Sequence, residues 1–136
     1  MPALSADTPV TMADLPAAVQ AAVKDQTKTA KLVGLSKETE NGKTTYEAET
    51  TLNGKSRDVS FDKSGAIIGI EQEVDLDSIP APAKAAIQKQ IGTGKLKKVE
   101  SVTERSSPVS YEATIVRNGK TSEVGVNADG TPHKED

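Results

Sequence analysis

An internal repeat is the feature that most limits what this chain can fold into. Shifting the sequence by 64 residues places Leu15 on Ile79 and Pro16 on Pro80. One residue is then inserted, and at an offset of 65 Tyr46-Glu47-Ala48 falls on Tyr111-Glu112-Ala113, and Asn53-Gly54-Lys55 on Asn118-Gly119-Lys120. Self-similarity at a fixed period is the signature of a duplicated structural unit. The sequence therefore predicts two tandem copies of one unit.

Each copy is predicted to open with a helix. In the first copy, Leu15, Val19 and Val23 recur with the spacing of one helix face, and Pro16 suits the first turn of a helix. The second copy repeats this pattern over residues 80–91. The predicted organisation is a disordered leader over residues 1–13, a first repeat over 14–74 and a second over 75–136, the two repeats forming one compact unit.

Strands are predicted after each helix. The expected strands are Lys31–Glu40, Lys43–Leu52, Lys55–Asp62 and Ala66–Glu73 in the first copy, and Lys95–Glu104, Val109–Arg117 and Lys120–Asn127 in the second. Asn41-Gly42 is typical of a type I′ hairpin turn, because both central residues of that turn need a positive φ. The predicted fold class is α+β: a helix followed by a 3–4-stranded antiparallel meander, duplicated in tandem, with the helices packed on one face of the sheet.

The alternation of side chains along these strands predicts a core face and an open face. Tyr46, Phe61 and Tyr111, the three aromatic residues of the chain, fall on the core face. The open face is the candidate partner-binding surface, and its residues are Thr45, Glu47, Glu49, Thr51, Ser110, Glu112 and Thr114. Binding energy in interfaces is concentrated in Trp, Tyr and Arg anchors. A small, acidic face therefore favours a weak or electrostatic contact.

The composition excludes several classes of protein. The 136 residues include no Cys, so there is no disulfide framework, no thiolate metal site and no thiol nucleophile. A formal net charge of −3 argues against nucleic acid as a partner, and no apolar run is long enough to span a membrane. His133 is the only histidine and has no nearby catalytic partner in the sequence. We therefore expect that the protein is not an enzyme and that it has no catalytic residue, no cofactor and no bound metal.

The pattern of residues resembles the PepSY-like family, which is also described as beta-lactamase-inhibitor-protein-like. The resemblance covers residues 14–132 in two copies. It rests on the helix start Leu-Pro-Ala-Ala-Val-Gln-Ala-Ala-Val, the Tyr-Glu-Ala-Glu strand, the Asn-Gly-Lys turn and the Asp-Lys-Ser-Gly turn. It implies a helix-on-sheet fold and a secreted, periplasmic or cell-surface protein. It also implies a non-enzymatic role in binding or inhibiting another protein, with no catalytic residues to carry over.

Two functions remain as alternatives at this point. The first is a non-catalytic extracytoplasmic binding module that inhibits a secreted or periplasmic enzyme, with an unknown protein partner and a monomeric state. The second is a cation- or small-ligand-binding accessory protein of the cell envelope that uses the acidic open face of the sheet. A separate candidate for a hard cation is the acidic segment with Glu71, Glu73, Asp75 and Asp77, whose oxygen atoms are suitable ligands. Residues 1–7 lack the pattern of a signal peptide, so we expect the mature form of a periplasmic or secreted protein.

Overall fold

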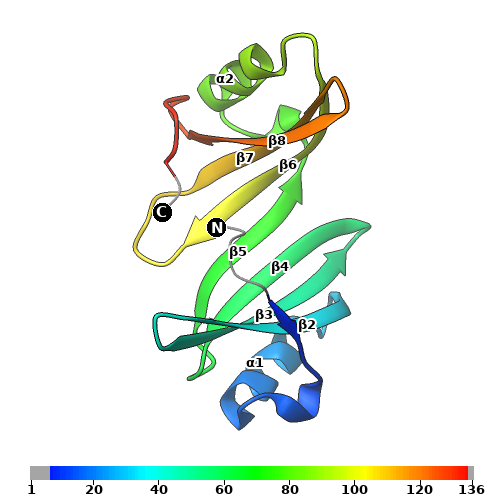
Figure 1. Cartoon of the computed structure of the whole chain (residues 1–136), viewed down its shortest axis with the longest axis vertical. Coiled ribbons are helices and arrows are strands. Elements are labelled where there is room, and N and C mark those ends of the chain that lie inside the picture. The colour runs from blue at the N-terminus through cyan, green and yellow to red at the C-terminus, as the bar shows by residue number, and fades with distance from the viewer. Residues whose placement is uncertain (1–6, 135–136) are drawn as a thin grey trace. The chain divides into compact units, whose positions relative to one another are not determined.

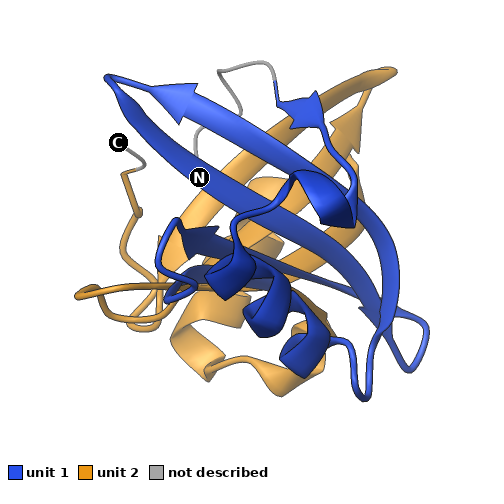
Figure 2. Cartoon of the chain, turned by 90° about the horizontal axis from the view of Figure 1, so that it is seen from below, with its two compact units in different colours: residues 1–71 blue, residues 72–136 orange. Residues whose placement is uncertain are grey.

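A computed structural model describes residues 7–134 of the chain (Figure 1). Its contacts divide the chain into two units, Met1–Glu71 and Gln72–Asp136, which Figure 2 draws in blue and orange. The strands follow one another in sequence order, β1 to β8, in one eight-stranded antiparallel sheet. The boundary between the units falls within a strand, so each unit is described separately below.

Unit 1 consists of a short strand, a helix and a series of long strands. Its elements are β1 (Thr8–Pro9), the 3₁₀ turn η1 (Met12–Asp14), α1 (Ala17–Gln26), β2 (Lys31–Glu40), β3 (Lys43–Leu52) and β4 (Lys55–Asp62), and β5 (Ile67–Val74) begins in it. Asp14 of η1 reaches back to the residue before the turn, because the backbone N–H and the hydroxyl of Thr11 both donate to Asp14 Oδ2, each at 2.9 Å. The chain therefore passes from the edge strand to the helix through a fixed turn.

Unit 2 takes up the remainder of β5 and continues with a second helix and three strands. Its elements are η2 (Leu76–Ser78), α2 (Ala81–Ile91), β6 (Lys95–Glu104), β7 (Ser110–Arg117) and β8 (Lys120–Asn127). β7 pairs with both β6 and β8 in antiparallel register. As in unit 1, a proline stands at the helix start, where its missing N–H leaves no helical hydrogen bond unmade.

The predicted fold class was wrong. We expected a helix followed by a meander of three or four strands, repeated in tandem. Over residues 7–134, however, one eight-stranded sheet dominates, and the two α-helices are short, with 10 and 11 residues. The prediction also missed β1, which lies within the segment expected to be a leader; residues 1–6 of that segment lie outside the described residues. β1 is two residues long and contains Pro9, so it has no alternation to detect, and only its pairing with β2 makes it a strand.

Each unit has a core between its helix and its strands. In unit 1, Val19 and Val23 of α1 pack against Val59 and Phe61 of β4, and Phe61 is 0% exposed. The core of unit 2 consists of Ile79, Ala83, Ile87, Val99, Ala113, Ile115 and Val126. Tyr46 packs against the first core and Tyr111 against the second. The prediction that the aromatic rings face inward is therefore confirmed.

Two glycines allow a turn to lie directly on a helix. Gly65, in the turn after β4, has a φ of +86°, and a Cβ atom there would lie 2.6 Å from the carbonyl oxygen of Ala18 in α1. Gly130, after β8, has a φ of +88°, and its Cβ would lie 2.7 Å from the carbonyl oxygen of Pro82 in α2. Only glycine meets both conditions without strain. The same local device therefore attaches the sheet to the helix in each unit.

The units also share an irregularity in strand register. The pairing of β2 with β3 shifts between Leu32 and Gly34, and the pairing of β6 with β7 shifts between Leu96 and Lys98. A bulge of this kind redirects the side chains that follow it. Gly34 and Lys98 therefore occupy corresponding places in the two units, one without a side chain and one with a positive charge.

Candidate functional site

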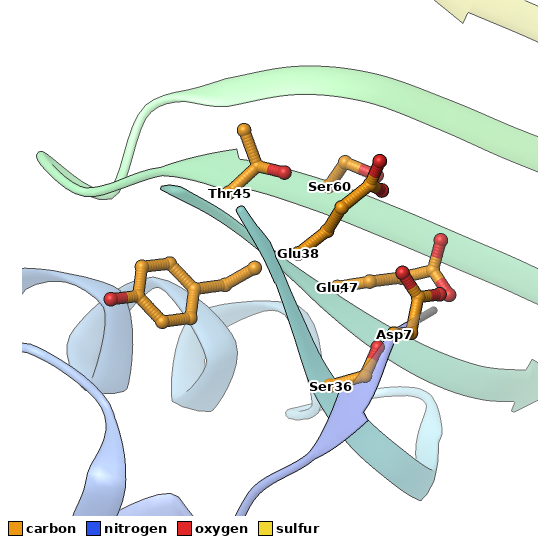
Figure 3. Close-up of a pocket in the computed structure, with 7 residues that line it drawn as sticks. Asp7, Ser36, Glu38, Thr45, Glu47 and Ser60 are labelled. Atoms are coloured by element: carbon orange, nitrogen blue, oxygen red, sulfur yellow. The ribbon is translucent and has the colours of Figure 1, made fainter. Parts of the chain in front are cut away.

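A shallow pocket lies on the open face of unit 1 (Figure 3). The empty space between its walls, open solvent included, is about 210 Å³, and its lining residues are Asp7, Ser36, Glu38, Thr45, Tyr46, Glu47 and Ser60. Glu47 lies at its centre, because β3 pairs it with Ser36 of β2 on one side and with Ser60 of β4 on the other. The carboxylates of Asp7 and Glu38 lie on the same side of the sheet as that of Glu47 (Figure 3). The pocket is therefore polar and acidic.

The surroundings of Glu47 disfavour its charged form. The pKa of Glu47 is raised to about 7, mainly by partial burial and then by the negative charges of Asp58, Asp7, Glu71 and Glu49, in that order. Burial and like charges both destabilise a carboxylate relative to the neutral acid. At neutral pH the side chain of Glu47 is therefore close to half protonated, whereas an ordinary glutamate is fully charged.

Asp7 extends the acidic site to the N-terminal edge of the unit. Its pKa is raised by partial burial, by the charge of Glu38, by a side-chain hydrogen bond with Glu38 and by the charge of Glu49. Asp7 therefore adds a further carboxyl group to the acidic cluster around Glu47.

The structure brings together only part of the predicted partner-binding surface. Thr45 and Glu47 line the pocket, Glu49 lies exposed farther along β3, and Thr51 is half-buried outside the pocket. On β7, Ser110 is 3% and Glu112 is 5% exposed, while Thr114 is half-buried. The candidate surface is therefore accessible on β3 and largely buried on β7.

Sequence reasoning missed four of the residues that line the pocket. Ser36 and Glu38 lie on β2, Ser60 lies on β4, and Asp7 precedes β1. By strand alternation, the first three point to the open face. Knowledge of how the strands pair would therefore have placed them beside Glu47. Asp7 gives no such signal, because its segment is too short to show a pattern.

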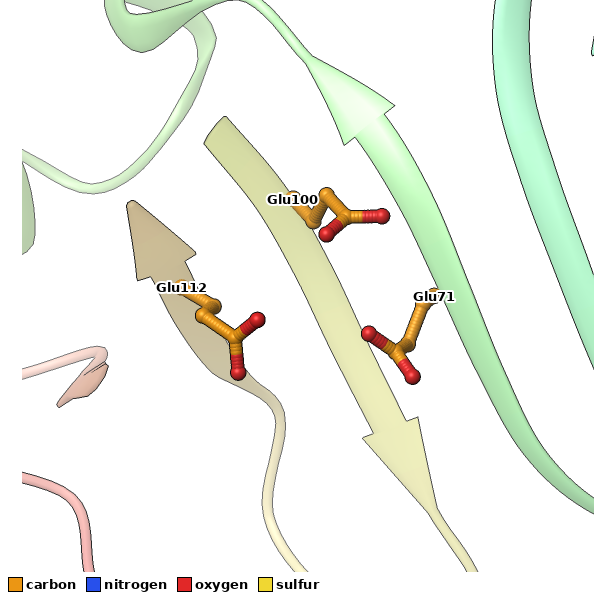
Figure 4. Close-up of side chains that lie close together, drawn as sticks. All are labelled: Glu71, Glu100 and Glu112. Carbon is orange, nitrogen blue, oxygen red and sulfur yellow. The ribbon is translucent and has the colours of Figure 1, made fainter. Parts of the chain in front are cut away.

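Unit 2 carries a buried pair of carboxylates at the place that corresponds to the pocket. Glu100 of β6 lies directly opposite Glu112 of β7, and their carboxylate oxygens lie within 4.8 Å of one another (Figure 4, which also draws Glu71 of β5). Lys98 Nζ lies 3.6 Å from Glu100 Oε1. Like charges directly opposite on neighbouring strands are destabilising, and a nearby cation offsets this. Unit 1 has Gly34 where unit 2 has this lysine.

Two other candidates, Asp77 and His133, have local structural roles. Asp77 forms an ion pair with Lys84, with Oδ1 and Nζ 2.7 Å apart, and this hydrogen-bonded lysine lowers the pKa of Asp77. His133 Nδ1 lies 2.8 Å from Asn127 Oδ1, and its backbone N–H donates to the carbonyl of Gly125 at 3.0 Å. These contacts attach the C-terminal segment to β8. Within residues 7–134, no helix is long and apolar enough to cross a membrane.

The fold has counterparts among solved structures, although no protein-family model and no curated protein matches the sequence. A predicted periplasmic protein from Bacteroides eggerthii superposes with a TM-score of 0.72 at 18% identity, covering 88% of this chain and 86% of that one. A DUF2874 family protein from Bacteroides uniformis gives a TM-score of 0.68 at 20% identity, covering 88% and 86%. A BLIP-like protein from Bacteroides fragilis superposes with a TM-score of 0.62 at 19% sequence identity, and the match covers 88% of this chain and 83% of that one. The chain therefore shares the fold of BLIP-like proteins.

Proposed function

We propose that this chain is a non-catalytic extracytoplasmic binding module that contacts a basic surface of a partner protein through the acidic pocket of unit 1. The observation that carries the proposal is the environment of Glu47. The charges that act on Glu47 are carboxylates. Unit 1 has Gly34, without a side chain, at the position where unit 2 has Lys98. A lysine or arginine from a partner would supply the complementary charge.

Geometry around Gly34 supports this proposal. A Cβ atom at Gly34 would lie 3.6 Å from Glu49 Oε2, so the carboxylate of Glu49 lies over the bulge of β2 without a side chain beneath it. Glu49 is exposed, and Glu47 lies two residues away on the same face of β3. A cationic group entering here would favour the ionised form of Glu47, so its binding would release a proton near neutral pH.

The extracytoplasmic location and the inhibitory role belong to the same proposal. Their support is the likeness in fold to a predicted periplasmic protein and to a BLIP-like protein. The open face holds no large aromatic anchor among the predicted surface residues, which favours an electrostatic contact over a tight apolar one. The proposed partner is a secreted or periplasmic enzyme with a basic surface.

We further propose that the chain contains two PepSY-like copies related by duplication. The repeat at 64 and 65 residues supports this, together with the bulges before Gly34 and Lys98 and the turns at Gly65 and Gly130. After duplication, the lysine of unit 2 would have allowed a buried pair of carboxylates there. The glycine of unit 1 would have left an open acidic pocket.

The proposed contact is tested by affinity capture from periplasmic and secreted extracts. The full chain is compared with the double variant Glu47→Gln/Glu49→Gln and with Glu123→Gln, which removes one exposed charge on β8 of unit 2. We expect a partner that the wild type and Glu123→Gln retain, that the double variant loses, and that raised ionic strength releases. A partner that all three proteins retain equally, or no partner at micromolar concentration, would contradict the proposal.

A second candidate function, cation binding, is favoured by the carboxylate pair of unit 2. Glu100 and Glu112 are 6% and 5% exposed and lie opposite one another on the paired strands β6 and β7. Carboxylate oxygens are the ligands of Ca²⁺ and Mg²⁺. Calorimetric titration of the chain with each ion, with Glu112→Gln as the comparison, separates this candidate from the first. A flat titration of the wild type would remove it.

A further inference from the structure

The strand that borders the acidic pocket is short, and the residue directly after it, Val10, packs against the core of unit 1. β1 has two residues, and its register with β2 comprises only Thr8 with Lys37 and Pro9 with Ser36. Pro9 has no N–H to donate, and the hydrogen bond that follows is from the Val10 N–H to the Leu35 carbonyl, at 3.0 Å. An edge element with so few hydrogen bonds can open locally without unfolding the unit.

The residue immediately before this strand carries one of the pocket's negative charges. Asp7 lines the pocket together with Glu38 and Glu47. The titratable groups that face Glu47 from the surrounding elements are Asp7 ahead of β1, Glu38 on β2, Glu49 on β3, Asp58 on β4 and Glu71 on β5. All of them are acids. Lys37, the nearest lysine to β1 in register, instead acts on Asp14.

We propose that ionisation of Glu47 releases β1 from the edge of β2, so that this edge is covered in mildly acidic solution and uncovered in mildly alkaline solution. When Glu47 loses its proton to solvent, its new charge repels the carboxylates around it. Glu38, Glu49 and Asp58 lie on strands paired over eight residues or more, whereas Asp7 adjoins a two-residue strand. The repulsion is therefore relieved most easily by the departure of Asp7 together with β1.

The electrostatics place the transition near neutral pH. The pKa of Glu47 is raised to about 7, mainly by burial and then by the neighbouring acids. Departure of β1 removes the charge of Asp7 and part of the burial, so the pKa of Glu47 falls and ionisation and release reinforce one another. Release also leaves backbone N–H and C=O groups of β2 unpaired around Leu35, and such an edge can accept an extended segment of a partner. This inference stands without the proposed basic partner.

The test follows the backbone amide of Val10 by hydrogen exchange, measured by NMR on the full chain and corrected for the chemical exchange rate at each pH. In the wild type we expect the protection of Val10 to fall by about threefold or more between about pH 6 and about pH 8. In Glu47→Gln we expect the protection to stay constant. The matched control Glu123→Gln removes an exposed charge from β8, away from the pocket, and should retain the fall.

Two results would overturn the proposal. One is a constant protection of Val10 in the wild type over this range, and the other is the same fall in Glu47→Gln as in the wild type. If Glu47→Gln does not fold, Asp7→Asn serves in its place, because it removes the charge from the moving segment and leaves β3 unchanged. A fall that persists in Asp7→Asn would equally contradict the proposal, and its absence would support it.

Discussion

Substituting Glu47 by Gln should change how the stability of the protein depends on pH. The pKa of Glu47 is raised from its ordinary value of 4.5 to about 7 by burial and by neighbouring carboxylates. The folded state therefore binds the proton more tightly than the unfolded state does. The stabilisation from this proton is fully present below about pH 4.5 and is lost as the pH rises through about 7. Gln is uncharged at every pH and removes this dependence.

The magnitude follows from the two pKa values. The difference between about 7 and 4.5 corresponds to at most about 3 kcal/mol. Because Glu47 is only partly buried, solvent screening reduces the expected effect to about 1–2 kcal/mol. Relative to the wild type, Glu47→Gln should thus be more stable by about 1–2 kcal/mol at about pH 8, and the difference should shrink toward zero at about pH 4.5.

The assay is urea unfolding followed by far-UV circular dichroism at several pH values between these limits, since the chain has no Trp for fluorescence. Glu123→Gln, an exposed carboxylate on β8, is the control and should follow the wild type at every pH. If the stability difference between Glu47→Gln and the wild type is the same at all pH values, the account of the acidic pocket is refuted.

Four further substitutions test the packing within each unit by the same urea assay. Gly65→Ala should destabilise the protein by about 2–4 kcal/mol, and Gly54→Ala by only about 1–2 kcal/mol. Both glycines have a positive φ, but only Gly65 lies against a helix carbonyl. Equal losses of stability in the two variants would contradict the close approach of Gly65 to the helix. Phe61→Ala should cost about 3–5 kcal/mol, and an unchanged midpoint would show that the ring is outside the core. Lys98→Met should cost about 1–2 kcal/mol by leaving buried Glu100 without its cation, whereas no loss would mean that the 3.6 Å pair is electrostatically unimportant.

The local elements of this protein are readable from its sequence. The predicted strands Lys31–Glu40, Lys43–Leu52 and Lys55–Asp62 have the bounds that the structure shows. The side chains of Lys43–Leu52 alternate between two faces, and the Asn-Gly pairs between the strands adopt positive φ, as at Asn41 (+53°) and Gly42 (+76°). Alternation and turn chemistry act between near neighbours, so a single sequence records them.

The acidic pocket was only half visible in the sequence. Thr45 and Glu47 share one strand, and their alternation places them on the open face. Asp7, Ser36 and Ser60 come from other segments, and their meeting depends on how the strands pair. Side-chain period gives the face of a residue but not its neighbour across the sheet, because a slip of two residues preserves the face and changes every partner.

By itself, the sequence determined the inward direction of the aromatic rings and the acidic character of the open face, since each depends on residue type and spacing along the chain. The tertiary structure alone decided that Thr8–Pro9 is a strand, that Glu47 lies among other carboxylates and that Glu112 is buried opposite Glu100. These features depend on hydrogen bonding and charge between segments far apart in sequence, which a local pattern does not encode. The pKa of Glu47, and the function proposed for its pocket, arise from that long-range assembly.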